Sequence, residues 1–280
     1  MQVCQRQSYT LERPTDEGAV CCMCGAVLYP FKINLFGAHK TINPRPPCGQ
    51  CQEKAEGAKL ERERRKMAQV RREEIVGFLC RAGVSKRHAN QYKTIIWPEM
   101  DPVTKGFLEG TNEKKGLFIT GKNGTGKTSL AVRACAYLIL RLHSPTFITL
   151  TGLFCKLQEA INDPYNSEAR VLKEYSHANW LFLDDIGAKR GTDYVNEKMF
   201  ELLDYRLTND LPTCFTSDLD LDQLEKHFEI AKSEGSGRRL TERILEMCEI
   251  SNLSGSSWRR STPRPSTPAK KSFGAYQADD

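Results

Sequence analysis

The chain has 280 residues, of which 39% are apolar, and its 41 basic and 35 acidic residues give a net charge of +6. This length suggests one or two domains, and the net charge permits a nucleic-acid partner without requiring one. No apolar run approaches the ~20 residues of a membrane span, and the N-terminus has no signal-peptide core, so we expect a cytoplasmic protein with no membrane partner. Eleven cysteines, an odd number, argue against a fully paired set of disulfides.

Residues 1–52 are rich in Cys, Pro and Gly and contain two C-x-x-C pairs, Cys21 with Cys24 and Cys48 with Cys51. Four thiolates in two such pairs are the ligand set of a closed tetrahedral Zn²⁺ site. The separation of the pairs is slightly longer than usual, and a hairpin with a longer loop would absorb the difference. Cys22 is the spare thiol. A thioredoxin-like redox pair is the alternative, but it would need one pair beside a βαβ pattern. We therefore expect a small zinc-binding domain.

Residues 53–79 are dense in charge and in good helix formers, with sparse apolar positions. This composition predicts a charged, solvated linker helix. A basic helix face that touches nucleic acid is the alternative.

From residue 80 to residue 260 the pattern alternates between short apolar runs and helical spacing. The runs at 116–120, 145–150, 180–184 and 212–217 each have the length of a strand, and helices are predicted over 128–142 and 196–208. Such alternation is typical of βαβ units, so we expect an α/β fold with a parallel sheet flanked by helices. The Ser/Pro-rich, basic tail 261–280 is predicted to be disordered.

The strongest motif follows the run at 116–120. The stretch from Gly121 to Thr128, GKNGTGKT, fits the phosphate-loop pattern G-x-x-x-x-G-K-[ST] between a predicted strand and a predicted helix. Glycines let backbone N–H groups wrap a phosphate chain, Lys127 supplies charge to the β- and γ-phosphates of ATP, and the Thr128 hydroxyl is a ligand for Mg²⁺. The predicted nucleotide-binding residues of the loop are Gly121, Asn123, Gly124, Thr125, Gly126, Lys127, Thr128 and Ser129.

An acidic partner for this loop ends the run at 180–184. The stretch NWLFLDDIG places Asp184 and Asp185 after four apolar residues. Parallel sheets bind ligands at the carboxyl ends of their strands. Asp184 is therefore predicted to hold Mg²⁺, and Asp185 is predicted to orient or deprotonate the attacking water. A pair of solvated acids ending a strand is the simpler alternative.

Across residues 80–260 the sequence resembles the AAA+ family of DnaC/DnaI-type helicase loaders and the related IstB-type transposition ATPases. The resemblance rests on GVSKRH, GKNGTGKTSLA, LFLDDIGAKRGTDYVNEKMFELLDYRL, LPTCFTSDLDLDQL, RRLTERILEM and SSWR. It implies that Asp218 lies at the sensor-1 position, where the family usually has Asn, near the γ-phosphate. It also implies that Arg243 is an arginine finger for a neighbouring subunit and that Arg259 is the sensor-2 arginine. A surface ion pair is the alternative role for each arginine.

Three functions agree with these features. The first, implied by the resemblance, is an ATP-dependent loader of a replicative DNA helicase onto single-stranded DNA, with slow Mg²⁺-dependent hydrolysis and ATP-dependent homo-oligomers. The second is an IstB-like transposition helper, against which the extra zinc domain argues. The third is a zinc-dependent nucleic-acid-binding module with ATP as a switch and little hydrolysis.

Basic stretches offer candidate DNA contacts, but no aromatic residues interleave with them as a stacking platform requires. These stretches are 62–72, 189–190, 238–239 and 259–271.

Overall fold

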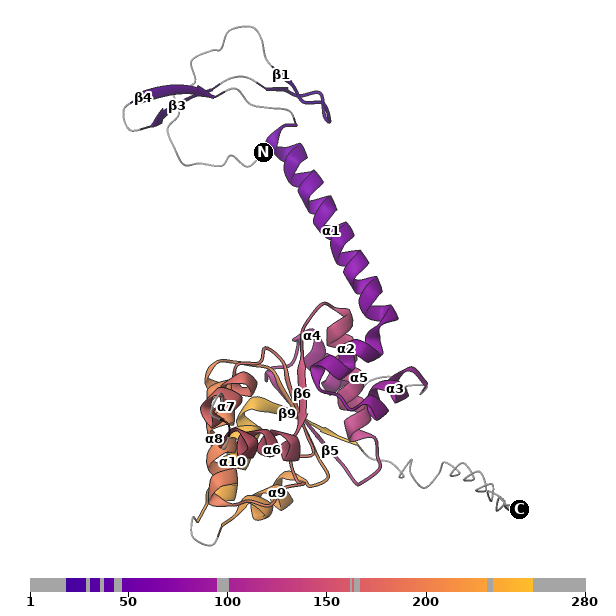
Figure 1. Ribbon diagram of the computed structural model, residues 1–280, viewed down its shortest axis with the longest axis vertical. Coiled ribbons are helices and arrows are strands. Elements are labelled where there is room, and N and C mark those ends of the chain that lie inside the picture. The colour runs from indigo at the N-terminus through magenta and orange to yellow at the C-terminus, as the bar shows by residue number, and fades with distance from the viewer. Residues whose placement is uncertain are drawn as a thin grey trace, which may run out of the picture. The chain divides into compact units, whose positions relative to one another are not determined.

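The computed structural model describes residues 19–28, 31–35, 38–42, 47–94, 101–161, 163, 167–230 and 234–253 (Figure 1). The chain divides into two compact units, residues 1–69 and 70–280. Within the described ranges, no helix combines the length and the apolar character that a membrane crossing needs. The predicted Arg259 and the tail 261–280 lie outside the described residues.

The N-terminal unit contains two small antiparallel hairpins and most of a long helix. Strand β1 (Ala19–Val20) pairs with β2 (Val27–Leu28), and β3 (Phe31–Leu35) pairs with β4 (Ala38–Ile42). Helix α1 spans Gly49–Glu73. The second hairpin occupies the sequence between the two cysteine pairs, which is where the long spacing predicts one.

The segment predicted as one linker helix forms two helices. Helix α1 ends at Glu73, and α2 begins at Ile75 and ends at Ala82. The two differ in composition, because residues 75–82 read IVGFLCRA and bury Ile75 and Leu79 in the core of the C-terminal unit. Because these apolar side chains are buried, the charged helix ends at Glu73 and not at residue 79, where its composition predicts the end.

The C-terminal unit is built on a five-stranded sheet in the order β6-β7-β8-β5-β9, and every strand pair is parallel. This confirms the predicted α/β fold of the AAA+ phosphate-loop type. The four predicted strands are present, and β9 is an additional strand that the sequence pattern did not predict. The strands are β5 (Gly116–Thr120), β6 (Thr146–Thr149), β7 (Leu181–Asp184), β8 (Thr213–Ser217) and β9 (Cys248–Asn252).

Helices cover both faces of this sheet, as parallel sheets require. Beyond α2 they are α3 (Lys86–Thr94), α4 (Pro102–Glu109), α5 (Lys127–Leu140), α6 (Leu150–Ile161), α7 (Glu168–Ser176), α8 (Asp193–Thr208), α9 (Leu221–Phe228) and α10 (Ser236–Met247). Figure 1 shows α6, α7, α8 and α10 on one side of the sheet and α2, α3 and α5 on the other.

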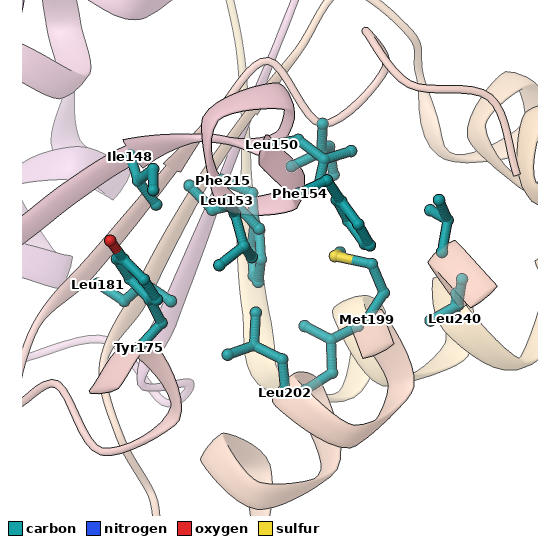
Figure 2. Packing of buried hydrophobic residues seen from close by; sticks show 14 of the residues in the cluster. Ile148, Leu150, Leu153, Phe154, Tyr175, Leu181, Met199, Leu202, Phe215 and Leu240 are labelled. Atoms are coloured by element: carbon teal, nitrogen blue, oxygen red, sulfur yellow. The ribbon is translucent and has the colours of Figure 1, made fainter. Parts of the chain in front are cut away.

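Successive strand residues divide between two hydrophobic clusters, because side chains alternate across a sheet. In β7, Leu181 and Leu183 belong to the cluster under α6–α8 and α10, whereas Phe182 belongs to the cluster under α2–α5. Figure 2 shows the first cluster, in which Phe215 of β8 and Met199 of α8 lie among the leucines. Because both faces of the sheet are buried, the register of its strands is fixed. The register in turn decides which polar residues meet at the carboxyl ends of the strands.

Candidate nucleotide site and candidate metal centre

The phosphate loop joins the carboxyl end of β5 to α5, and two of its glycines are required by the backbone. Gly126 caps the N-terminus of α5 with φ 98°, a left-handed value that favours glycine. Gly121 has φ 151°, and a Cβ atom there would lie 2.5 Å from the carbonyl oxygen of Leu253. Larger residues at these positions would displace the loop, so the motif glycines fit the role assigned to them.

Loop carbonyls surround the ammonium group of Lys127. Its Nζ donates to the carbonyl oxygen of Gly121 at 2.7 Å and to that of Lys122 at 3.2 Å. The hydroxyl of Thr125 donates to the same Lys122 carbonyl at 2.9 Å. Ser129 follows in the first turn of α5 and is half-buried. The loop therefore places a cation at the N-terminus of a helix, where phosphate oxygens are favoured.

Thr128 of α5 and Asp184 of β7 meet although β5, the strand before the phosphate loop, is not next to β7. Strand β8 lies between β5 and β7. The hydroxyl of Thr128 donates to Oδ1 of Asp184 at 3.0 Å and to Oδ2 at 3.2 Å. A hydroxyl and a carboxylate are the oxygen donors that Mg²⁺ prefers in proteins. These two residues fit the shared magnesium ligation predicted for them.

Thr216 of β8 also contacts the acidic pair, and the sequence reasoning missed it. Its buried hydroxyl donates to Oδ1 of Asp184 at 2.5 Å and accepts from the backbone N–H of Asp185 at 2.9 Å. Asp185 has φ 57°, a left-handed conformation that Asp tolerates better than most residues. The only sequence signal was the position of Thr216 near the end of the predicted 212–217 strand, which becomes informative once β7 and β8 are known to pair.

Asp218, at the predicted sensor position, contacts the phosphate loop. Its Oδ2 accepts a hydrogen bond from Nδ2 of Asn123 at 3.1 Å. Asp218 is also close enough to affect Asp185, whose pKa lies above its usual value. Partial desolvation is the main cause, the charges of Asp184 and Asp218 add to it, and Lys127 opposes it. The structure thus brings three carboxylates and one ammonium group to the same edge of the sheet.

A hollow of about 440 Å³ opens beside the loop, but its lining differs from the predicted phosphate ligands. It includes Gly121 and two carboxylates, and it excludes Lys127, Thr128 and Asp184. Of the predicted nucleotide-binding residues, Gly121 and Asp218 line this hollow, and the phosphate-binding position beside Lys127 stays a prediction. The hollow is lined by Thr120, Gly121, Lys122, Asp218, Asp220, Gln223, Asn252 and Leu253.

Arg243, the predicted arginine finger, lies on α10 and forms ion pairs within its own chain. Its guanidinium is 3.2 Å from Asp204 of α8 and 3.3 Å from Glu246, and it lies 5.5 Å from the centre of the Phe200 ring. Its side chain is 35% exposed. This geometry shows the ion pair that was the alternative role, and a role in a neighbouring subunit stays a prediction.

The four predicted zinc ligands converge in the N-terminal unit. The sulfur atoms of Cys21, Cys24, Cys48 and Cys51 all lie within 4.8 Å of one another, and those of Cys24 and Cys48 are 3.6 Å apart. A tetrahedral site with Zn–S bonds of about 2.3 Å has S–S edges of about 3.8 Å. Cys22 is exposed and lies outside this group. The donor set therefore fits a structural zinc ion.

The thiols of this cluster also differ in acidity. Backbone N–H groups, chiefly that of Cys48 and then those of Met23 and Cys24, lower the pKa of the Cys21 thiol to about 6. The neighbouring sulfurs of Cys24 and Cys48 raise the pKa of Cys51 to about 12. Four crowded thiols cannot all ionise without a cation among them, and a divalent metal supplies that charge.

The phosphate loop after β5, the acidic end of β7 and the inserted strand β8 define a nucleotide-binding protein of the AAA+ phosphate-loop type. The family described as "IstB-like ATP binding protein" matches residues 105–266, and the chain belongs to this family. Membership supports nucleotide use at the site built around Lys127. The matched range leaves out the cysteine cluster.

Individual relatives carry more specific names. The replicative helicase loader DnaI of Bacillus subtilis is 31% identical over 161 residues, which are 55% of this chain and 51% of that protein. The replicative helicase loader DnaC of Escherichia coli K12 is 27% identical over 176 residues, which are 60% of this chain and 69% of that protein. The matching segment thus spans about half the length of the first relative.

Two solved structures also match this chain. A crystal structure of DnaI shares 25% identity and a TM-score of 0.48, with 59% of this chain and 88% of that chain covered. A crystal structure of the DnaC helicase loader shares 22% identity and a TM-score of 0.49, with 61% and 100% covered.

Proposed function

We propose that this protein is an ATP-dependent loader that places a replicative hexameric DNA helicase onto single-stranded DNA in the cytoplasm. The observation that carries the proposal is the similarity to two helicase loaders, together with a site in which Thr128 and Asp184 meet. A transposition helper is the second candidate, because the family is named after IstB. The cysteine cluster, which lies outside the family match, favours the loader.

The chain's residues divide the chemistry among them. Lys127 and the loop N–H groups bind the phosphates of ATP, and Thr128 with Asp184 holds Mg²⁺, which when bound neutralises phosphate charge. Asp185 orients the attacking water and accepts its proton. Hydrolysis is slow and resets a conformational state rather than driving bulk turnover. Asp218 at the end of β8 senses the γ-phosphate side of the site through its contact with Asn123.

Assembly completes the site in this proposal. Arg243 leaves its ion pairs to reach the nucleotide of a neighbouring subunit, and Arg259 faces the nucleotide of its own subunit. An arginine suits both roles because its charge is permanent and its planar fork matches phosphate oxygens. The protein therefore forms ATP-dependent homo-oligomers.

The segments have separate tasks. Residues 1–52 form a zinc-binding domain, with Zn²⁺ held by Cys21, Cys24, Cys48 and Cys51, that docks the helicase. Residues 53–79 link it to the ATPase domain of residues 80–260. Zinc here has a structural role, since all four of its positions are taken by protein ligands.

Nucleotide binding is tested with a fluorescent ATP analogue and two lysine variants of the loop. Lys127→Ala removes a charged contact worth roughly 1.5–3 kcal/mol, so affinity falls by about tenfold or more. Lys122→Ala removes a neighbouring exposed charge and leaves affinity within about twofold of wild type. Equal losses in the two variants would contradict the assigned site.

Helicase docking is tested by a pull-down with the full chain as bait and the hexameric replicative helicase of the same genome as prey. The wild type and Cys22→Ser retain the helicase, whereas Cys21→Ser/Cys24→Ser loses it. Capture by all three chains would reject the docking role of the zinc domain. Capture of a transposase but not of the helicase would favour the second candidate.

A further inference from the structure

One face of the C-terminal unit is formed by helices that carry basic residues and no acidic ones. Residues 75–94 and 127–147 contain no Asp or Glu, yet they carry Arg81, Lys86, Arg87, Arg133 and Arg141. These two segments form α2, α3 and α5, which pack against one another (Figure 1). In the sequence, Glu73 and Glu74 directly precede α2. The summed charge of the three helices is therefore positive.

Arginines and a tyrosine alternate along α5. Arg133, Tyr137 and Arg141 follow one another at intervals of four residues, so they lie on one face of the helix or directly after its end. The guanidinium of Arg141 lies over the Tyr137 ring, 4.2 Å from its centre. Four residues advance about 6 Å along a helix, so the two arginines are about 12 Å apart along the axis.

A second arginine–aromatic group on α2 adjoins the end of α5. The Phe78 ring has Arg81 over it at 4.1 Å and Arg71 at 5.3 Å. Arg71 in turn donates from Nη1 to the carbonyl oxygens of Ile139 at 2.9 Å and His143 at 2.8 Å, at the C-terminal end of α5. Phe78 and its arginines therefore lie beside the turn that carries Arg141. We call Phe78, Arg81, Arg133, Tyr137 and Arg141 the α2–α5 arginine surface.

We infer that the α2–α5 arginine surface binds the sugar-phosphate backbone of single-stranded nucleic acid. Arg81 and Arg141 are exposed, while Phe78 and Tyr137 are half-buried beneath them. An arginine held over a ring keeps its donor fork oriented and loses less freedom when it binds a phosphate oxygen. Exposed arginines held in this way can neutralise successive phosphates of a strand without reading its sequence. The inference rests on the proposed function, which requires contact with single-stranded DNA.

The test measures binding of the full-length protein to a fluorescein-labelled oligothymidylate by anisotropy between about 50 and 200 mM salt. Arg81→Glu/Arg141→Glu is expected to weaken binding by at least tenfold. Each lost phosphate contact lowers the salt slope by about 0.7 for single strands, so the double variant loses about 1.4. Arg81→Lys/Arg141→Lys keeps the charge and should retain most of the affinity.

The control variant is Lys173→Glu/Lys226→Glu, which changes the net charge equally. Both lysines are exposed, on α7 and α9, helices whose packing partners include α6, α8 and α10. If the control and the Arg81→Glu/Arg141→Glu variant bind the oligonucleotide with equal affinity, the inference is overturned. An acidic protein surface would then be the partner of this face. Equal loss in the Glu and Lys variants also overturns it, because packing would then be the cause.

A separate readout distinguishes this inference from the proposed function. All variants should bind the ATP analogue like the wild type, which shows that the ATPase domain is folded. If the wild-type chain binds the oligonucleotide through this surface but fails to capture the helicase, the loader proposal fails and the inference stands. If the wild-type chain captures the helicase but binds no oligonucleotide at low salt, the inference fails and the docking of the helicase stands.

Discussion

The hydroxyl of Thr216 on β8 donates a hydrogen bond to Oδ1 of Asp184 on the neighbouring strand β7, at a distance of 2.5 Å. The hydroxyl oxygen of Thr216 also accepts a hydrogen bond from the backbone N–H of Asp185, so one buried side chain orients both acidic residues. Thr128, in the first turn of α5, also donates from its hydroxyl to Oδ1 of Asp184. Asp184 is thereby fixed between two threonines.

Thr216→Val is expected to lower the turnover number for ATP by about 10–100-fold, because it removes the group that orients a metal-binding carboxylate. The valine has a similar shape, so the fold should persist. Steady-state ATPase rates as a function of Mg²⁺ concentration check this, and the Mg²⁺ requirement should rise in the variant.

Thr216→Ser is the matched control, since it keeps the hydroxyl and removes only a methyl group. It should stay within a few-fold of wild type. A serine variant as slow as the valine variant would show that packing, rather than the hydrogen bond, explains the loss.

Asp218→Asn is expected to move the acidic limb of the pH–rate profile to lower pH. Desolvation first, and then the charges of Asp184 and Asp218, raise the pKa of Asp185. Asp185 acts in its ionised form, so activity is present above its pKa and is lost as pH falls through it. Removing the Asp218 charge lowers that pKa. We would measure kcat/KM against pH beside the exposed control Asp222→Asn, and an unshifted or upward-shifted limb in Asp218→Asn argues against Asp185 as the base.

Arg243→Ala is expected to lower turnover by about 10³-fold or more, as for other arginine fingers, with ATP affinity within about twofold of wild type. The ion pair with Asp204 is no obstacle, because partly exposed ion pairs contribute only about 0–1 kcal/mol. Asp204→Asn removes one of the two ion pairs of Arg243 and leaves the one with Glu246, and it should leave turnover at or above the wild-type rate.

Mixed oligomers separate action in the same subunit from action in the neighbour. Lys127→Ala subunits lack a working site but can offer Arg243 to Arg243→Ala subunits, so mixing two inactive proteins should restore ATPase activity. Absence of any recovery, or a parallel loss of ATP affinity in Arg243→Ala, rejects the finger assignment.

The cysteine cluster predicts about one zinc ion per chain in the purified protein, measured by elemental analysis. Cys48→Ser should lose most of this metal, whereas Cys22→Ser should keep it because Cys22 lies outside the cluster. A wild-type metal content far below one per chain, with all four ligands intact, contradicts the zinc site.

Local patterns predicted the features that depend on neighbouring residues in the sequence. Glycine spacing and apolar runs predicted the phosphate loop, the strand before it and the acidic end of β7. The spacing of the two C-x-x-C pairs predicted that their four sulfur atoms lie together. The contact of Thr216 with Asp184 depends on strand order, which pairing between distant segments decides. Strand β9 escaped prediction because its sequence, CEISN, has no apolar run. The position of Arg71 over Phe78, with its hydrogen bonds to the end of α5, arises only once α1, α2 and α5 pack together.

The loading reaction itself is the most direct test of the account. The replicative helicase of the same genome is incubated with closed circular single-stranded DNA, ATP and this protein, and DNA-bound helicase is quantified after gel filtration. We predict that the helicase co-elutes with the circle when the wild-type protein is present and that Lys127→Ala does not support this. Equal loading with and without the protein, or with Lys127→Ala in its place, would contradict the account.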